Sequence, residues 1–168
     1  MVRPEQKLVL ITGNSRSGTT HMHRMLRKVG LDVGHEYVQK DGTVSCFFFV
    51  DHSWYPDKPS ERPKAHQGQR YGDFYFENSY HVVRHPLKCI GSNCSTMGVQ
   101  HSTWLDDLGL VPYEGQYVRT GRTKLWRMMR MWHEVNLACE KETDWRFRIE
   151  NVDQVWKRMA RELGLGKI

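Results

Sequence analysis

A chain of 168 residues, 39% of them hydrophobic, has enough apolar material for one core, so we expect a single domain over 1–168. Its 25 lysines and arginines against 19 acidic residues give a net charge of +6, which favours an anionic partner. The sequence lacks an apolar run of about 18 residues and the order of a signal peptide, which argues against a membrane protein and predicts a soluble, cytoplasmic one.

A strand and a glycine-bearing loop open the predicted fold. Leu8–Thr12 is a short aliphatic and β-branched run, typical of a buried parallel strand. Directly after it, Gly13 and Gly18 have the spacing of the phosphate-binding pattern G-x-x-x-x-G-K-[ST], but Thr19 occupies the lysine position. Apolar residues then recur at helical spacing up to Gly30, which predicts an amphipathic helix whose N-terminus faces the loop.

Two strand-like runs follow, Leu31–Glu36 and Thr43–Val50. The polar, proline-bearing segment 51–72 predicts a long loop. The run SYHVVRHP, residues 79–86, predicts a third core strand, and Pro86 suits the first turn of the next helix. Along that helix we expect an apolar face that comprises Leu87, Ile90, Cys94 and Met97.

The last third of the chain alternates in the same way. A long helix is predicted from Arg122 to about Thr143, the segment 145–151 alternates as a final strand, and Val152–Leu163 predicts a closing helix. On the long helix the expected apolar face comprises Leu125, Met128, Met129, Trp132, Val135 and Cys139. Strands alternating with helices predict an α/β fold with a central parallel sheet, in one three-layer, P-loop-like domain.

The four cysteines, Cys46, Cys89, Cys94 and Cys139, form no C-x-x-C pair and have no histidines at the spacing of a zinc site. We therefore expect buried free thiols, no disulfide and no bound metal. The nine histidines are scattered, which also argues against a metal cluster.

The loop lacks the lysine that reaches the β- and γ-phosphates in nucleotide triphosphatases, so ordinary ATP hydrolysis is disfavoured. An anion site is still expected, because the amides of the loop and of the first helical turn point toward the ligand and the helix dipole adds positive charge. Arg16 supplies a formal charge, with a planar fork of donors suited to phosphate or sulfate oxygens.

A second candidate anion-binding pair lies at the end of the third strand. Arg84 closes that strand, and Ser92 follows eight residues later, about two turns along the helix that begins near Pro86. The guanidinium and the hydroxyl can therefore converge on one phosphate at the carboxyl edge of the sheet. The alternative is that Arg84 is a surface ion-pair partner and Ser92 an ordinary residue of a helix surface.

These residues resemble a known family. The segment SRSGTT, Ser15–Thr20, is similar to the 5′-phosphosulfate loop of sulfotransferases that use 3′-phosphoadenosine 5′-phosphosulfate (PAPS), and Arg84 with Ser92 has the spacing of the pair that grips the 3′-phosphate there. Looser similarity to bacterial sulfotransferases extends over VGHEYVQKDGTVS, WHEVN and RFRIENVDQVWKRMARELGL. The resemblance implies PAPS as the cofactor, no metal, and a cofactor site made of Arg16, Ser17, Gly18, Thr19, Thr20, Arg84 and Ser92.

The resemblance also implies a catalytic base. Glu36 is the first choice, because GHE resembles the glutamate-bearing segment of tyrosylprotein sulfotransferases. If this segment is extended, the neighbouring His35 points the opposite way. The alternative for Glu36 is a surface carboxylate paired with Lys40 or an arginine. The rival base is His66, because the segment KAH resembles the Lys-x-His of cytosolic members, and its alternative is a solvated loop histidine.

The implied reaction is transfer of a sulfuryl group to a hydroxyl or amine of a small-molecule or glycan acceptor, with Arg16 stabilising charge on the leaving phosphate. The alternatives are a degenerate P-loop nucleotide kinase or triphosphatase, and a non-enzymatic basic module that binds a polyanion. No nucleic-acid motif is present, so no nucleic-acid partner is expected. The chain also contains a basic run, which comprises Arg119, Arg122, Lys124, Arg127 and Arg130. This run could be a solvated helix face, or it could attract an acidic acceptor or the phosphates of the cofactor.

Overall fold

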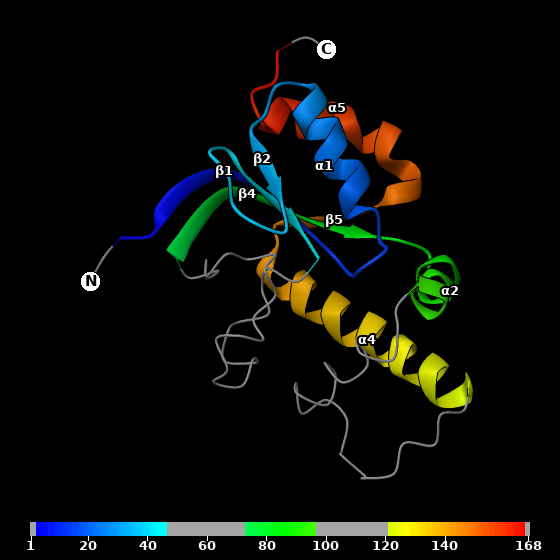
Figure 1. Ribbon diagram of the computed structural model, residues 1–168. Helices are drawn as coiled ribbons and strands as arrows, with labels where there is room; N and C mark the ends of the chain where they lie inside the picture. Colours follow the sequence, from blue (N-terminus) through cyan, green and yellow to red (C-terminus); the bar gives the residue numbers. More distant parts are fainter. Residues whose placement is uncertain (1–2, 47–72, 97–120, 167–168) are drawn as a thin grey trace.

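The computed structural model describes residues 3–46, 73–96 and 121–166 of the protein. In this part of the chain, five parallel strands form one sheet in the order β2-β3-β1-β4-β5, flanked by helices, so the fold is α/β (Figure 1). In chain order the elements are β1 (Glu5–Thr12), α1 (Thr19–Lys28), β2 (Val33–His35), β3 (Gly42–Ser45), β4 (Phe74–Val83), α2 (Pro86–Thr96), α4 (Gly121–Glu142), β5 (Trp145–Arg148), the short 3₁₀ helix η5 (Ile149–Asn151) and α5 (Val152–Glu162).

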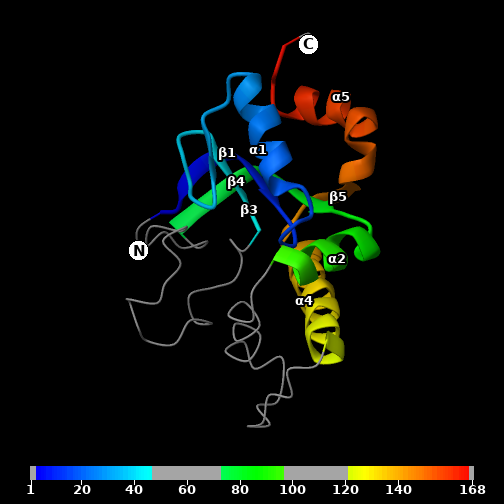
Figure 2. The same cartoon turned by 45° about the vertical axis from the view of Figure 1, so that its right-hand side comes forward.

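The helices lie on both faces of the sheet, α1 and α5 on one face and α4 on the other (Figures 1 and 2). On the first face, Val9 and Ile11 of β1 pack with Met22 and Leu26 of α1, all fully buried. On the second face, α2 packs against α4, and Ile90 contributes to their shared apolar cluster. Both faces of the central strands are covered, as in most parallel sheets.

The observed elements confirm the predicted order of strands and helices, but several boundaries differ. β1 begins at Glu5 rather than Leu8, and β2 is shorter than the predicted run Leu31–Glu36. β4 begins at Phe74 rather than Ser79, because it pairs with β1 from its first residue, Glu5 opposite Phe74. The final strand ends at Arg148, and the chain then tightens into η5 instead of continuing as a strand to Asn151. The predicted strand Thr43–Val50 is seen from Gly42 to Ser45, and its residues 47–50 lie outside the described part, as does the predicted loop 51–72.

The predicted apolar face of α2 is wrong at its first residue. The Leu87 side chain is 78% exposed, whereas Cys89, Ile90 and Asn93 are buried. The buried side of α2 faces the loop after β1 and contains the polar residue Asn93, so hydrophobicity alone predicted the wrong rotation of the helix. Met97, also assigned to this face, lies outside the described residues.

The predicted apolar face of α4 is wrong at two residues, Leu125 and Met129, which are 47% and 50% exposed. Met131, which was not assigned to the face, is 1% exposed. The observed buried stripe follows the contact with α2 and the sheet and consists of Met128, Met131, Val135 and Cys139. Because α4 carries methionine or leucine on several sides, its sequence pattern did not define a single buried face.

All four cysteines are free thiols, three of them buried and Cys94 only partly so. Within the described residues, none of the helices is long and apolar enough to cross a bilayer. The same part of the chain holds no cluster of three or more side chains suited to a metal ion.

Candidate functional site

The loop between β1 and α1 is held from beneath by buried polar side chains. Asn14 is fully buried; its amide nitrogen donates to the Met131 carbonyl of α4 at 3.1 Å, and its amide oxygen accepts from Asn93 of α2 at 3.3 Å. Asn93 also donates to the Ser15 carbonyl at 3.3 Å, and the Cys89 thiol donates to the same oxygen at 3.1 Å. Burial raises the pKa of the Cys89 thiol to about 11, so the thiol stays protonated as a donor.

The two glycines of the phosphate-binding spacing are required by close contacts. A Cβ at Gly13 would lie 2.1 Å from the Val82 carbonyl oxygen, on the neighbouring strand β4. Gly18 has φ +109°, and a Cβ there would lie 2.6 Å from Cγ1 of Ile149. Arg16 also has a positive φ, 68°, which is uncommon for a residue with a side chain. The loop therefore has a defined and partly strained shape.

The two predicted anion-binding motifs meet at Arg16. Its Nε donates to Ser92 Oγ at 3.0 Å, and Arg84 Nη1 donates to the Arg16 carbonyl at 3.2 Å. Residues 68 and 76 positions away in the sequence are thus joined to one loop residue. Arg84 and Ser92 therefore both contact the loop, and among the described residues neither contact is an ion pair.

A cavity of about 440 Å³ opens above the loop at the carboxyl edge of the sheet. Arg16, Arg24 and Arg84 line it, together with the first residues of α1. Gly18 caps this helix without any side-chain hydrogen bond, and its first turn contains no acidic residue. The amide groups at the helix start and the guanidinium groups therefore give the cavity a positive field suited to an anion.

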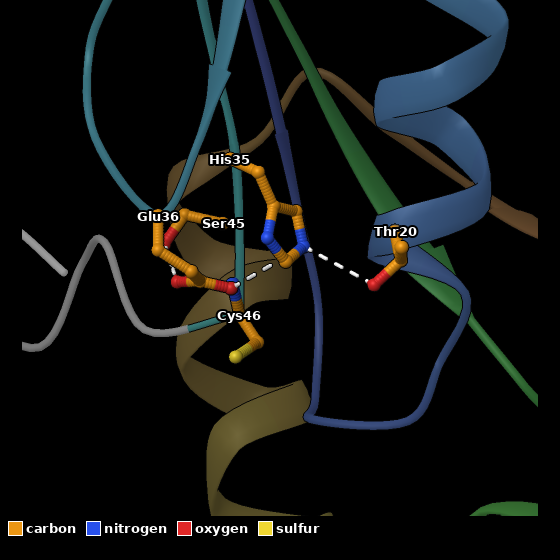
Figure 3. Close-up of polar contacts among 5 residues, drawn as sticks. All are labelled: Thr20, His35, Glu36, Ser45 and Cys46. Atoms are coloured by element: carbon orange, nitrogen blue, oxygen red, sulfur yellow. Dashed lines mark hydrogen bonds and ion pairs between the residues drawn. The ribbon is translucent and has the colours of Figure 1, made fainter.

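Glu36 also lines this cavity and lies directly after β2. Ser45 Oγ donates to its Oε2 at 2.6 Å, and the Cys46 amide donates to its two carboxylate oxygens at 3.0 and 3.2 Å (Figure 3). The side chain is 16% exposed. Among the described residues its partners are thus the end of β3 and His35, not Lys40 or an arginine, so the carboxylate is held in place and faces the site.

His35 and Glu36 lie together, which corrects the expectation that they point opposite ways. His35 Nε2 is 3.3 Å from Thr20 Oγ1 of α1 and 3.8 Å from Glu36 Oε1 (Figure 3). The physical reason is that Glu36 is not extended: its φ is 65°, so the chain turns at this residue. Gly34 permits the turn, because a Cβ there would lie 1.9 Å from the Tyr37 carbonyl.

The remaining predicted residues fall into three groups. Gly18, Thr19 and Thr20 line the cavity with Arg16 and Arg84, whereas Ser92 reaches it only through Arg16. The Ser17 side chain is fully buried beneath the loop, 2.8 Å from the position of a Gly13 Cβ, and its amide donates to the Asn14 carbonyl. The rival base His66 lies outside the described residues.

The predicted site lacked several residues that line the cavity, namely Ser15, His21, Arg24, His35 and Cys46. Arg24 follows Thr20 by four residues on α1, and this spacing was an available signal that both share one helix face. Of the predicted basic run, the structure describes the side chain of Arg130, whose Nε lies 3.6 Å from Glu134 Oε1. Burial, followed by the adjacent Glu36 carboxylate, raises the pKa of the Cys46 thiol well above its usual value, which makes it a poor nucleophile.

Comparison of the chain with protein-family models, with curated proteins and with solved structures found no match in any of the three. The function of the cavity must therefore be inferred from its side chains and from the sequence pattern.

Proposed function

We propose that this protein is a PAPS-dependent sulfotransferase with a P-loop-like donor site, which transfers a sulfuryl group to the hydroxyl or amine of a small-molecule or glycan acceptor. The observation that carries the proposal is the junction at Arg16, which contacts Ser92 through its side chain and Arg84 through its carbonyl. The two sequence motifs that resemble the 5′ and 3′ phosphate sites of such enzymes are thus in contact through one loop residue.

The residues present fit a ligand with two separate anionic groups. The uncapped start of α1 and the Arg16 guanidinium suit a 5′-phosphosulfate, while Arg84 and Ser92, which both contact Arg16, suit a 3′-phosphate. A cavity of about 440 Å³ is within the range of small-molecule sites. Among the described residues that line it there is no lysine, and the loop has Thr19 at the lysine position of the phosphate-binding pattern, which disfavours a nucleotide triphosphatase.

The bound donor would supply an activated sulfuryl group and a phosphate leaving group. Arg16 and the amides at the start of α1 stabilise the negative charge that develops on that leaving phosphate. Thr19 and Thr20 also line the cavity, and their hydroxyl groups are further donors. Because a sulfuryl group carries less charge than a phosphoryl group, these fixed donors suffice without a metal ion.

Glu36 is the proposed base. As the acceptor oxygen or nitrogen bonds to sulfur and the bond from sulfur to the leaving phosphate oxygen breaks, Glu36 takes the acceptor proton. Ser45 and the Cys46 amide orient the carboxylate, and His35 lies between it and Thr20, at the loop. His35 therefore bridges the base and the donor loop by polar contacts on both sides.

Calorimetric titration at fixed salt tests the proposal, with adenosine 3′,5′-bisphosphate, adenosine 5′-phosphate and ATP with Mg²⁺ as ligands. We expect the bisphosphate to bind most tightly. Arg84→Ala should weaken its binding by about 1.5–3 kcal/mol, because a charge-assisted contact to the 3′-phosphate is lost, and should affect adenosine 5′-phosphate much less. Arg161→Ala, on the exposed side of α5, is the matched control.

Two results would contradict the proposal. Tighter binding of ATP with Mg²⁺ would indicate a degenerate kinase or triphosphatase. Binding of none of the three nucleotides, together with salt-sensitive binding of polyanions, would favour a basic interaction module.

A further inference from the structure

Arg24 is a cation of the cavity above the loop to which the proposed reaction gives no role. It lies on α1, is exposed, and lines the cavity together with Arg16 and Arg84. Those two arginines are held by polar contacts, Arg16 by Ser92 and Arg84 by the Arg16 carbonyl. Arg24 forms no hydrogen bond or ion pair with a residue that the structure describes. All the donors of its guanidinium are therefore open to water or to a ligand.

The position of Arg24 on α1 relates it to the end of β2. Glu36 follows β2 and Arg84 follows β4, and these two strands lie on opposite sides of β1 in the sheet. α1 leads from β1 to β2, and Oγ1 of Thr20 in its first turn lies 3.3 Å from Nε2 of His35 at the end of β2 (Figure 3). Arg24 is one turn further along the same helix face, about 6 Å along the axis. Thr20 and Arg24 thus share the face of α1 that contacts the end of β2, next to Glu36.

The charge of Arg24 is not balanced by the carboxylate of the same cavity. Among the described residues that line the cavity, Glu36 is the one carboxylate, and its two oxygens accept from Ser45 Oγ and the Cys46 amide. Its ion-pair partner among those residues is His35, at 3.8 Å, and not Arg24. The proposed reaction assigns Arg16 and the residue Arg84 to the two anionic groups of the donor. The cavity therefore has one further cation for a third anionic group.

The neighbouring base explains which ligand would use this cation. Glu36 has to be ionised to take a proton, so an acceptor with a negative charge of its own is repelled at the base. An arginine on the adjacent helix face offsets this repulsion and can bind a carboxylate, phosphate or sulfate through two parallel N–H donors. A neutral acceptor gains no such contact. The charges on this side of the cavity therefore favour an acceptor that carries an anionic group in addition to its reacting hydroxyl or amine.

We propose that Arg24 binds an anionic group of the acceptor, so that the acceptors are small molecules or glycans with a carboxylate, phosphate or sulfate beside the reacting hydroxyl or amine. This inference rests on the proposed sulfotransferase function and adds the class of acceptor. The transfer step is the same: the acceptor oxygen or nitrogen bonds to sulfur, the bond from sulfur to the leaving phosphate oxygen breaks, and the acceptor proton goes to Glu36. Arg24 holds the acceptor and takes no part in these bonds.

Calorimetric titration of the protein saturated with adenosine 3′,5′-bisphosphate tests this proposal at fixed moderate salt. Two pairs of probes differ chiefly in charge: para-hydroxyphenylacetate with para-hydroxyphenylacetamide, and methyl glucuronide with methyl glucoside. We expect the anionic member of at least one pair to bind at least about tenfold more tightly than its neutral partner. The preceding titration with the bisphosphate alone tests the sulfotransferase function, so the two proposals are measured separately.

Two variants locate the anionic contact. Arg24→Met removes the guanidinium and keeps an unbranched side chain suited to a helix, so it should weaken the anionic probe about tenfold, to the affinity of its neutral partner. It should change the affinity for adenosine 3′,5′-bisphosphate less than about threefold, in contrast to Arg84→Ala. Arg161→Met, at an exposed position on α5 away from the cavity, removes the same charge and is the matched control.

Three results would overturn the role of Arg24 while the bisphosphate still binds to the unchanged protein, and they would leave the sulfotransferase proposal in place. The first is equal affinity within both pairs of probes, or no saturable binding of any probe below about 10 mM. The second is a preference for the anionic probe that persists in Arg24→Met. The third is a large loss of bisphosphate affinity in Arg24→Met, which would assign Arg24 to the donor. Failure of the bisphosphate to bind to the unchanged protein would overturn both proposals.

Discussion

The two cavities of this protein share one arginine, Arg84, but are built differently. The first cavity depends on backbone: a loop with two positive-φ residues, a helix start, and a turn at Glu36 hold its charged groups. The second cavity, of about 410 Å³ on the face of the sheet that α4 covers, depends on side chains that α4, β4 and β5 bring together, among them Trp132, His81 and Arg146. A cavity that is shaped by one loop and the start of one helix can be recognised from a short sequence motif. A cavity that is lined by residues of a helix and two strands has no such motif, because its residues are far apart in the sequence.

The largest expected effect concerns Glu36. Glu36→Gln removes the proposed base and should lower the rate of sulfate transfer about 100-fold or more. The measurement is transfer of labelled sulfate from PAPS to a panel of phenols, sugars and amines. Glu140→Gln, which changes a carboxylate of the second cavity, is the matched control and should retain the rate. A similar loss of the transfer rate in both variants would mean that the effect is not specific to the Glu36 carboxylate.

The shape of the loop is tested by Gly13→Ala. The added Cβ meets the Val82 carbonyl of a packed strand, so the free energy of unfolding should fall by about 3 kcal/mol. Urea denaturation measures the change. Gly91→Ala is the control, because that glycine lies in α2 with open space around it and should gain up to about 1 kcal/mol of stability. Equal stability of the two variants would contradict the close approach of the loop to β4.

Ser92→Ala should have a smaller effect, confined to the first cavity. It removes the hydroxyl that accepts from Arg16 Nε, and the affinity for adenosine 3′,5′-bisphosphate should fall by about 1 kcal/mol. Calorimetry measures this loss against Ser95→Ala, an exposed serine on the same helix. If Ser95→Ala costs as much as Ser92→Ala, the contact with Arg16 is not specific to the site.

The smallest expected effect is a pH dependence that belongs to the second cavity. Burial lowers the pKa of His81 below its ordinary value of 6.5; Arg146 acts in the same direction, whereas Asn136 and Glu140 oppose it. The unfolded chain therefore binds a proton below pH 6.5 that the folded chain does not, so the free energy of unfolding falls as the pH drops from 6.5 toward the lowered folded pKa.

His81→Gln should reduce this pH dependence, and urea denaturation at pH 7.5 and 5.5 compares the two proteins. The contribution of His23, whose pKa burial also lowers, is present in both and cancels. His133→Gln, at an exposed position on α4, should behave as the unchanged protein. If the free energy of unfolding depends on pH as strongly in His81→Gln as in the unchanged protein, burial does not keep His81 neutral.

The parts of the site that the sequence could predict are those with local causes. Glycines at fixed spacing and a strand that ends next to Arg84 indicated that the loop after β1 and Arg84 lie at the carboxyl edge of a parallel sheet. The sequence did not show that His35 and Glu36 lie together, because the positive φ of Glu36 has no signal in its residue type. A glutamate in the left-handed region is uncommon, and only the packing of the turn after β2 determines it.

The remaining errors have tertiary causes. Leu125 and Met129 are exposed because α2 and the sheet select one side of α4 among several apolar ones. The second cavity depends on the rotation of α4, which brings Trp132 and Asn136 to the strand that carries His81. No periodicity in a single segment contains that information.

The hydrogen bonds beneath the first loop have a thermodynamic consequence for ligand binding. Asn14, Asn93 and the Cys89 thiol already fix the loop from α2 and α4, so its conformational entropy is lost during folding rather than during association. A ligand that binds there need not order the loop, and its affinity is set mainly by the balance between charge attraction and the desolvation of the guanidinium groups. We therefore expect association to be rapid and sensitive to ionic strength, as for a rigid, preorganised receptor.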